Sequence, residues 1–177
     1  MGTVMEAITK RCSTRGYTTD EPGREEIGKI IEAGLKAPTA ANMQEIHFSV
    51  LKGDNPVLKE IEDEKNRLRN ITNAEQNFYY GAPIVVILSG KKDFNWSFLD
   101  AGIAVENMAL AATEMGLGNL IIGCIYDAMH GEKEEQFSKA VGIPDGWEFE
   151  IAIAVGYQAV SKEPHTYDAD KQVNYCF

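Results

Sequence analysis

Hydrophobic residues recur every three or four positions in two segments near the start of the chain. Residues 3–11 and 24–37 both show this spacing, the second with a run of isoleucines. Such spacing places the apolar side chains on one face of a helix. We therefore predict two amphipathic helices. The second is expected to end at Pro38, because proline disfavours helix for the residue before it.

Four later segments have the patterns of β-strands. Residues 46–52 alternate apolar and polar side chains, and residues 82–90 form a short β-branched run that ends in glycine. Residues 119–126 and 147–157 are also predicted as strands, the last of them long. Charged segments between the strands predict surface helices, at residues 55–71 and 133–144.

One predicted helix has no polar face. It is apolar nearly all round from Phe98 to Met115, and glycines mark its end. A helix of this kind is buried on several sides, in a core or against a partner chain. Together with the mixed order of helices and strands, it predicts an α+β fold, completed by a second subunit. We expect one domain over residues 1–177, in which residues 158–177 form an extended C-terminal tail.

Charge narrows the classes of partner. The chain has 27 acidic and 17 basic residues, which gives a formal net charge of −10. Nucleic acids and anionic membrane surfaces are bound mainly by clustered lysine and arginine, so neither is expected as a partner. A small anionic ligand in a local basic pocket remains compatible with this charge.

The cysteines and the apolar runs indicate the cellular location of the protein. Cys12, Cys124 and Cys176 are far apart and have no metal-ligand spacing, so neither a disulfide framework nor a zinc site is expected. The N-terminal residues lack the long apolar region of a secretory signal, and the longest apolar runs are too short to span a bilayer. These features predict free thiols and a cytoplasmic location.

The stretch RCSTRGY places Arg11, Ser13 and Arg15 at alternate positions. In a helix the two arginines share a face that the serine does not, whereas in an extended segment all three side chains point the same way. Donors that converge in this way suit a phosphate group. The same residues also suit a solvated helix C-terminus, where basic residues are common. Spacing alone leaves both interpretations open and slightly favours the helix end.

The segment KAPTAANMQ at residues 36–44 is a second candidate. Its small residues let the backbone approach a ligand closely, and Asn42 and Gln44 supply amide donors and acceptors. Such groups suit a flat heterocycle, although the segment by itself fits a polar loop better. Farther along, Gly123 at a strand end offers a backbone N–H to a ligand or forms a bulge.

No segment supplies a convincing nucleophile with its base. The Rossmann and P-loop glycine patterns are absent, His47 is interpreted as a packed strand residue, and the acidic residues are interpreted as solvated helix faces. A pocket without an obvious acid, base or nucleophile indicates that a cofactor carries the chemistry.

Taken together, four stretches resemble the nitroreductase family of flavin-dependent enzymes, in the family's order and over nearly the whole chain. RCSTRGY is similar to the family's N-terminal phosphate motif, and residues 37–51 are similar to its second motif. DAGIAVENMALAATEMGLGNLIIG at 100–123 resembles the central helix with its following strand, and AVGY at 154–157 resembles the last core strand.

The resemblance implies a central, mostly antiparallel sheet flanked by helices, and a homodimer with the long helix at its core and two FMN sites at the interface. Arg11, Ser13 and Arg15 would hold the phosphate, ribityl and pyrimidine side of FMN. The backbone of Ile122 and Gly123 would lie near the reactive flavin nitrogen, and no side chain would be catalytic. Other expected FMN-binding residues are Cys12, in the first motif, and, from the partner subunit, Pro38, Thr39, Ala40, Asn42 and Gln44.

The family's activity is ping-pong transfer, in which NADH or NADPH reduces FMN and an electron-poor acceptor such as a nitroaromatic or a quinone then takes the electrons. Three departures stand out. Glu45–Ile46 replaces the usual Pro-Trp, the insertion before the central helix is reduced, and the usual tail ending is missing. Lys171, ahead of Lys162 and His165, is the candidate for the late phosphate contact. The reduced insertion keeps an alternative open, an FMN carrier or sensor without significant reductase activity.

Overall fold

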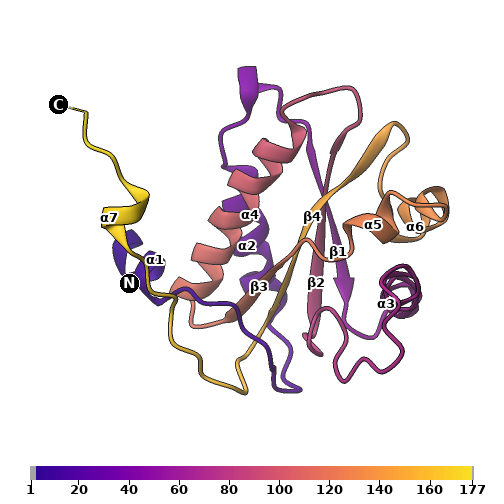
Figure 1. Ribbon diagram of the computed structural model, residues 1–177, viewed down its shortest axis with the longest axis horizontal. Helices are drawn as coiled ribbons and strands as arrows, with labels where there is room; N and C mark the ends of the chain where they lie inside the picture. The colour runs from indigo at the N-terminus through magenta and orange to yellow at the C-terminus, as the bar shows by residue number, and fades with distance from the viewer. Residues whose placement is uncertain (1–2, 177) are drawn as a thin grey trace.

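A computed structural model describes residues 3–176, so residues 1, 2 and 177 of the predicted domain lie outside the description. Figure 1 shows one sheet between two layers of helices. The helices α2 (Arg24–Leu35) and α4 (Ser97–Glu114) cover one face. The other face is covered by α3 (Pro56–Leu68), α5 (Tyr126–Met129) and α6 (Glu134–Val141).

The sheet has the order β1-β2-β4-β3, and each neighbouring pair is antiparallel. Its strands are β1 (Ile46–Lys52), β2 (Ile84–Lys91), β3 (Gly118–Ile122) and β4 (Trp147–Gly156). The β-branched run of β2 is buried up to Gly90 because this strand is central and both faces are covered. The predicted α+β architecture with an antiparallel sheet is confirmed.

Apolar side chains fill the space on both sides of the sheet. Leu58, Phe137 and Phe149 belong to the cluster under α3, α5 and α6, whereas Met108 and Ile153 belong to the cluster under α2 and α4. Because β4 contributes to both clusters, it lies at the centre of the hydrophobic core, where removal of apolar surface from water stabilises the fold.

The helix α3 corrects one expectation. The charged segment was predicted to be a surface helix, but Glu62, Glu64 and Lys65 are buried. Lys65 Nζ lies 3.0 Å from a carboxylate oxygen of Glu62, one turn earlier, and Glu62 also accepts a hydrogen bond from the backbone N–H of Phe78. Charged residues with spacing of three have the same sequence pattern whether they face water or pair in the interior.

Three short helices and one boundary were not foreseen. The first of these helices is the 3-10 helix η1 (Ala40–Asn42). The strand predicted over 119–126 ends at Ile122, and its last part forms a turn and the four-residue helix α5. In the tail, residues 161–168 have no regular structure, and α7 (Ala169–Gln172) adds one helical turn. Helices this short carry too few residues to show a period.

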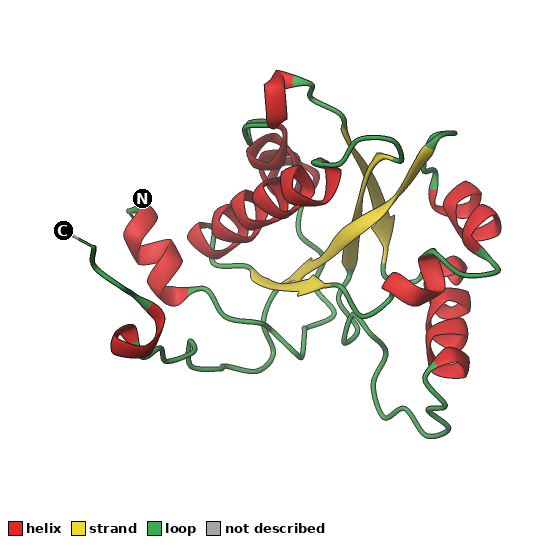
Figure 2. Cartoon of the chain, turned by 45° about the horizontal axis from the view of Figure 1, so that its top comes forward, coloured by secondary structure: helices red, strands yellow, loops and turns green. Residues whose placement is uncertain are grey.

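The N-terminal helix α1 (Val4–Lys10) begins with a capping box, in which Thr3 and Glu6 satisfy each other's backbone N–H. Figures 1 and 2 both place α1 beside α7, at the end of the molecule away from the centre of the sheet. Val4, Met5 and Ile8 are exposed there. This apolar side of α1 therefore has no cover from residues 3–176.

The long helix α4 is buried on the side that packs on the sheet, through Ala104, Met108 and Ala112 among others. Its outer side is open at the first turn, where Phe98 is 61% exposed and Leu99 is 52% exposed, and is half-buried farther along, at Ile103 and Leu110. The described residues therefore cover the apolar surface of α4 only in part. Within residues 3–176, no helix is both long and apolar enough to cross a membrane.

Candidate functional site

The segment Arg11–Arg15 leaves α1 and runs extended beside the first residues of β3. Ser13 forms a parallel bridge with Asn119, and the backbone N–H of Thr14 donates to the Asn119 carbonyl over 2.8 Å. Thr14 is buried while Arg15 is exposed, as alternation in an extended segment requires. The extended backbone is thus the conformation in which the three candidate anion-binding side chains point the same way.

The two guanidinium groups of this segment have few protein partners. Arg11 Nε lies 3.5 Å from Glu106 Oε1, and Arg15 lies over the ring of Tyr80 with 5.9 Å between the guanidinium carbon and the ring centroid. Neither donates a hydrogen bond to a carboxylate among the residues that the structure describes. Their forked donors are therefore available to an anion.

The C-terminal tail crosses the same segment. The thiol of Cys12 lies 3.2 Å from the Lys162 carbonyl oxygen, and the N–H of Ala159 donates to the Gly16 carbonyl. Lys171, the expected late phosphate contact, is on α7, where its ammonium pairs with Asp168 at 3.0 Å. Lys162 is thus the tail lysine whose backbone touches the motif.

The turn at residues 38–44 is held by side-chain hydrogen bonds. The Ala40 N–H donates to both carboxylate oxygens of Asp100, at 3.0 and 3.1 Å, and the Gln44 N–H donates to the Thr39 hydroxyl over 2.9 Å. Asn42 accepts from the Gln44 amide. Asp100, which belongs to the start of α4, therefore anchors the turn, a role that sequence reasoning missed.

The backbone of this turn is strained. Ala41, Asn42 and Gln44 have φ values of 49°, 55° and 54°. Residues other than glycine adopt this left-handed conformation at a cost of about 1–3 kcal/mol each, and such strain clusters at binding sites. The contacts with Asp100 and Thr39 explain how the turn keeps this shape.

The two predicted walls of the flavin site do not meet within one chain. The turn lies at the N-terminal end of α4, beside Asp100, whereas Arg11 lies farther along the helix, beside Glu106. No hydrogen bond or ion pair of the described residues joins the two segments. One chain brings together the first motif and β3, and leaves the 38–44 turn apart.

Gly123 follows β3 and borders a cavity of about 570 Å³. Its walls come from the segment between β2 and α4, from the start of α5 and from the first half of β4. Glu150 of β4 lines it and is only 6% exposed. Burial, and next the nearby Glu148, raise the pKa of Glu150 to about 7. The acidic residues were interpreted as solvated helix faces, and Glu150 contradicts this, because it is a buried strand residue.

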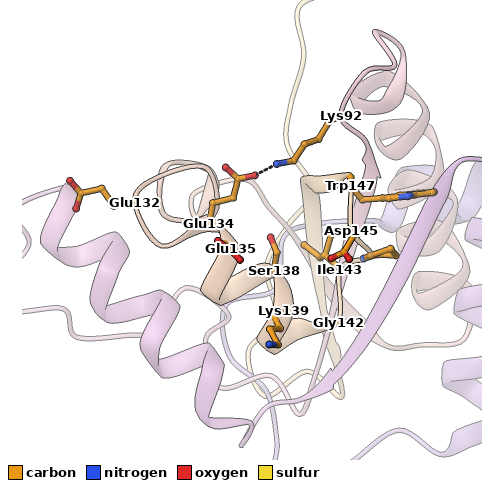
Figure 3. Close-up of a pocket in the computed structure, with 12 residues that line it drawn as sticks. Lys92, Glu132, Glu134, Glu135, Ser138, Lys139, Gly142, Ile143, Asp145 and Trp147 are labelled. Carbon is orange, nitrogen blue, oxygen red and sulfur yellow. Dashed lines mark hydrogen bonds and ion pairs between the residues drawn. The ribbon is translucent and has the colours of Figure 1, made fainter.

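A second hollow of about 790 Å³ lies beside α6. Figure 3 shows its charged lining, in which Lys92 Nζ lies 2.6 Å from a carboxylate oxygen of Glu134. None of the sequence-predicted site residues lines this hollow. The candidate site is therefore the surface from Arg11 along β3 to Gly123, and the smaller cavity beyond it.

Comparison with known proteins identifies the fold and the family. The family described as the nitroreductase family matches residues 8–157. This chain belongs to the nitroreductase family. A protein of Archaeoglobus fulgidus with the provisional name NADH dehydrogenase/NAD(P)H nitroreductase is 29% identical over 173 residues, which cover 96% of this chain and 92% of the relative.

Two solved structures of the family resemble the whole chain. A nitroreductase with bound FMN from Desulfitobacterium hafniense has a TM-score of 0.86 and 28% identity, with 100% of both chains covered. A second, with bound FMN from Bacteroides fragilis, has a TM-score of 0.85 and 26% identity over 96% of both chains. The predicted family and oxidoreductase class are confirmed, and the FMN in these structures agrees with the predicted cofactor.

Proposed function

We propose that this nitroreductase-family protein is an FMN-dependent NAD(P)H oxidoreductase that reduces nitroaromatics, quinones or similar electron-poor acceptors by a ping-pong mechanism. The observation that carries the proposal is the extended segment from Arg11 to Arg15 beside β3, in which neither guanidinium group has a hydrogen-bonded carboxylate among the residues that the structure describes. FMN-bound relatives of 26–28% identity support the choice of cofactor.

The residues present fit FMN. Arg11, Ser13 and Arg15 supply donors for the phosphate, ribityl and pyrimidine groups, and the strained, anchored turn presents amide groups to a flat ring. When bound, FMN supplies reversible two-electron chemistry. This chain would orient it, and backbone N–H groups at Ile122 and Gly123 would lie where they can stabilise negative charge on the ring. The proposed binding set also includes Cys12, Pro38, Thr39, Ala40, Asn42, Gln44 and Lys171.

The site becomes complete in a homodimer. The open parts of α1 and α4 expose Met5, Ile8 and Leu99, a surface typical of an interface between subunits. A second copy packed on α4 would bring its 38–44 turn to the first copy's Arg11 segment. We assign residues 1–177 to one domain with residues 158–177 as its tail, and we place the protein in the cytoplasm.

An anaerobic titration tests the function. The purified protein should show a flavin spectrum that NADH or NADPH bleaches, and a panel of nitroaromatics and quinones should restore the colour. A colourless protein with no affinity for added FMN contradicts the proposal. The segment between β2 and α4 spans only residues 92–96, too few for a lid, so a carrier or sensor is the second candidate. A yellow protein that neither nucleotide reduces identifies it.

Replacement of one guanidinium tests the phosphate site. Arg11→Ala should weaken FMN binding by about 1–3 kcal/mol, the scale of a charge-assisted hydrogen bond. Arg24→Ala removes an exposed guanidinium at the start of α2 and should leave FMN affinity unchanged. Fluorescence titration of FMN measures both. Equal affinities of the Arg11→Ala variant and the unmodified protein would remove Arg11 from the site.

A further inference from the structure

The strand β4 contains an extra residue where it passes β2. Leu88 pairs with Ile151 and Ser89 pairs with Phe149, so Glu150 has no residue opposite it. A β-bulge of this kind redirects the side chain of the inserted residue and is common next to active sites. The bulge thus turns the Glu150 carboxyl toward the start of α4 instead of leaving it in the regular alternation of the strand.

A glycine makes room for this carboxyl. A Cβ atom on Gly90 would lie 2.7 Å from Glu150 Oε1 and 2.5 Å from Ser97 Cβ, closer than real contacts allow. The Ser97 hydroxyl does not donate to this carboxyl, because it donates to the Lys91 carbonyl over 3.0 Å. The carboxyl therefore lies in a space shaped by Gly90 and Ser97, next to a hydroxyl that is already occupied.

Glu150 has no partner for its charge. None of residues 3–176 donates a hydrogen bond to its carboxyl group or forms an ion pair with it, although the residue is only 6% exposed. A buried carboxylate without a partner is unfavourable unless another charge compensates it. Burial raises the pKa of Glu150 to about 7 for the same reason, because the ionised form has no compensating charge beside it.

The charged groups around the cavity do not supply that compensation. Glu148 on the same strand is acidic, and its carboxylate lies 3.5 Å from His130 Nε2 at the end of α5. Lys92, from the segment after β2, pairs with Glu134 of α6 (Figure 3). The remaining titratable group is Tyr126 of α5, whose ring stacks on His130. The cavity is therefore acidic, and the carboxyl group of Glu150 has no positively charged partner among the described residues that line it.

The rest of the cavity is aromatic and of ligand size. Phe94, Phe98 and Tyr126 line it, and its volume of about 570 Å³ is within the usual range for small-molecule sites. Aromatic faces attract organic cations as well as flat rings. Gly123 joins the cavity to the β3 surface. A ligand there would have one end against an acid and the other toward the proposed flavin position.

We propose that the cavity lined by Glu150, Phe98 and Tyr126 binds organic cations, and that it selects flat electron acceptors that carry a protonated amine. This inference rests on the proposed function for the acceptor role, whereas the binding of a cation stands on the cavity itself. The ammonium group donates to the Glu150 carboxylate while the aromatic walls hold the ring. Acceptors with an anionic group are rejected by the pair Glu148 and Glu150.

A matched set of ligands tests this. The probes are para-nitrobenzylamine, which is a cation at neutral pH, the neutral para-nitrobenzyl alcohol and the anionic para-nitrobenzoate. Calorimetric titration into the protein supplemented with FMN, without pyridine nucleotide, should show the amine bound about tenfold more tightly than the alcohol, as expected for a charge-assisted hydrogen bond. The benzoate should bind most weakly.

Variants and the pH dependence of binding test whether the preference for the amine depends on Glu150. Glu150→Gln, which keeps the shape of the side chain, should abolish the preference for the amine, while Glu148→Gln should reduce it less because His130 already lies beside Glu148. Glu60→Gln removes an exposed charge on α3 and should change nothing. Because the amine binds the ionised carboxyl, its affinity should rise up to about tenfold between pH 6 and pH 8, and Glu150→Gln should remove this rise.

The outcomes separate this inference from the proposed function. Equal binding of amine and alcohol by the unmodified protein, or a preference that persists in Glu150→Gln, overturns the cation site. Failure of NADH and NADPH to reduce the flavin contradicts the proposed function only, since the calorimetric titration needs no reductant. A pH-independent amine affinity also counts against Glu150 as the partner.

Discussion

Glu64 and Glu150 are both buried carboxyl groups, but they lie on opposite sides of the sheet and differ in every contact. Glu64 of α3 is 2% exposed and accepts hydrogen bonds from Arg67, at 2.6 and 3.1 Å, and from Lys133, whose ammonium lies 2.9 Å away. Hydrogen bonds from Arg67 and then Lys133 lower the pKa of Glu64 to about 2. Glu150 has no such donors, and burial raises its pKa instead.

The contrast shows that the partners of a buried acid decide its role. A carboxylate surrounded by its own donors joins helices α3 and α6 and has nothing left to offer a ligand. A carboxyl turned into a cavity without donors destabilises the folded chain once it is ionised, and that deficit can be relieved by a ligand. Four changes to the chain, taken from the largest expected effect to the smallest, test this difference.

Replacement of Glu62 is the strongest test of the buried acids that have partners. Glu62→Ala leaves the buried ammonium of Lys65 without a counter-charge and the Phe78 N–H without its acceptor. The variant should lose about 3–5 kcal/mol of unfolding free energy, the usual cost of breaking a buried pair. Urea denaturation measures it, with Glu60→Ala on the same helix as a control that should stay within about 0.5 kcal/mol. A loss of similar size in the control would contradict a specific pair.

Glu150 should behave in the opposite way. Its pKa is higher in the folded chain than the ordinary value of 4.5, so its contribution to stability is complete below pH 4.5 and is lost as the pH rises through 7. Glu150→Gln should therefore be more stable than the unmodified protein at pH 8, by on the order of 2–3 kcal/mol, and equally stable at pH 4. Denaturation at both pH values, without ligand, checks this. A difference independent of pH would exclude ionisation as its cause.

Gly90 tests the space around that carboxyl. Gly90→Ala places a methyl group against Glu150 Oε1 and Ser97 Cβ, and should cost about 1–3 kcal/mol by overpacking. Gly28→Ala on α2 is the matched control, because a Cβ there would meet no atom within 4 Å other than those of its chain neighbours and of the helix's own backbone. It should be neutral or stabilise by up to about 1 kcal/mol through helix propensity. Thermal denaturation compares the two, and equal behaviour would show that the space at Gly90 is not restricted.

The smallest effect concerns Glu64 in acid. Its pKa is lower when folded, so the stability that it contributes is present above pH 4.5 and is lost as the pH falls toward 2. The unmodified protein should thus lose its advantage over Glu64→Gln between pH 5 and pH 2.5. Urea midpoints across this range measure the change. A constant difference between the two proteins would mean that the ion pairs with Arg67 and Lys133 do not depend on ionisation of Glu64.

Most of the fold could be predicted from the sequence because most elements are long enough to show a period. The helix α2, the strand β1 and the central strand β2 all follow their patterns. The four-residue helices α5 and α7 could not be predicted in this way. Nor could the burial of Glu62 and Lys65, because an i,i+3 pair has the same sequence pattern inside and outside the protein.

The candidate site could be predicted only in part. Alternation explains why Arg11, Ser13 and Arg15 act together once the segment is extended, and Gly123 lies at the strand end where a glycine was noted. Asp100 and Glu150 were missed as site residues for physical reasons. The anchor of a turn lies sixty positions away from it, and the stretch WEFEI alternates so regularly that no extra residue is visible.

The bulge at Glu150 divides β4 into two stretches of opposite parity. From residue 151 onward, odd positions such as Ile153 face α4 and even positions such as Ala152 face α3, but Phe149 packs on the α3 side although its number is odd. Deletion of Glu150 would remove the bulge and bring both stretches into one regular alternation, with Phe149 still on the α3 side and Ile151 still on the α4 side. The extra residue thus adds a carboxyl to the cavity without changing which apolar side chains pack on either face of the sheet.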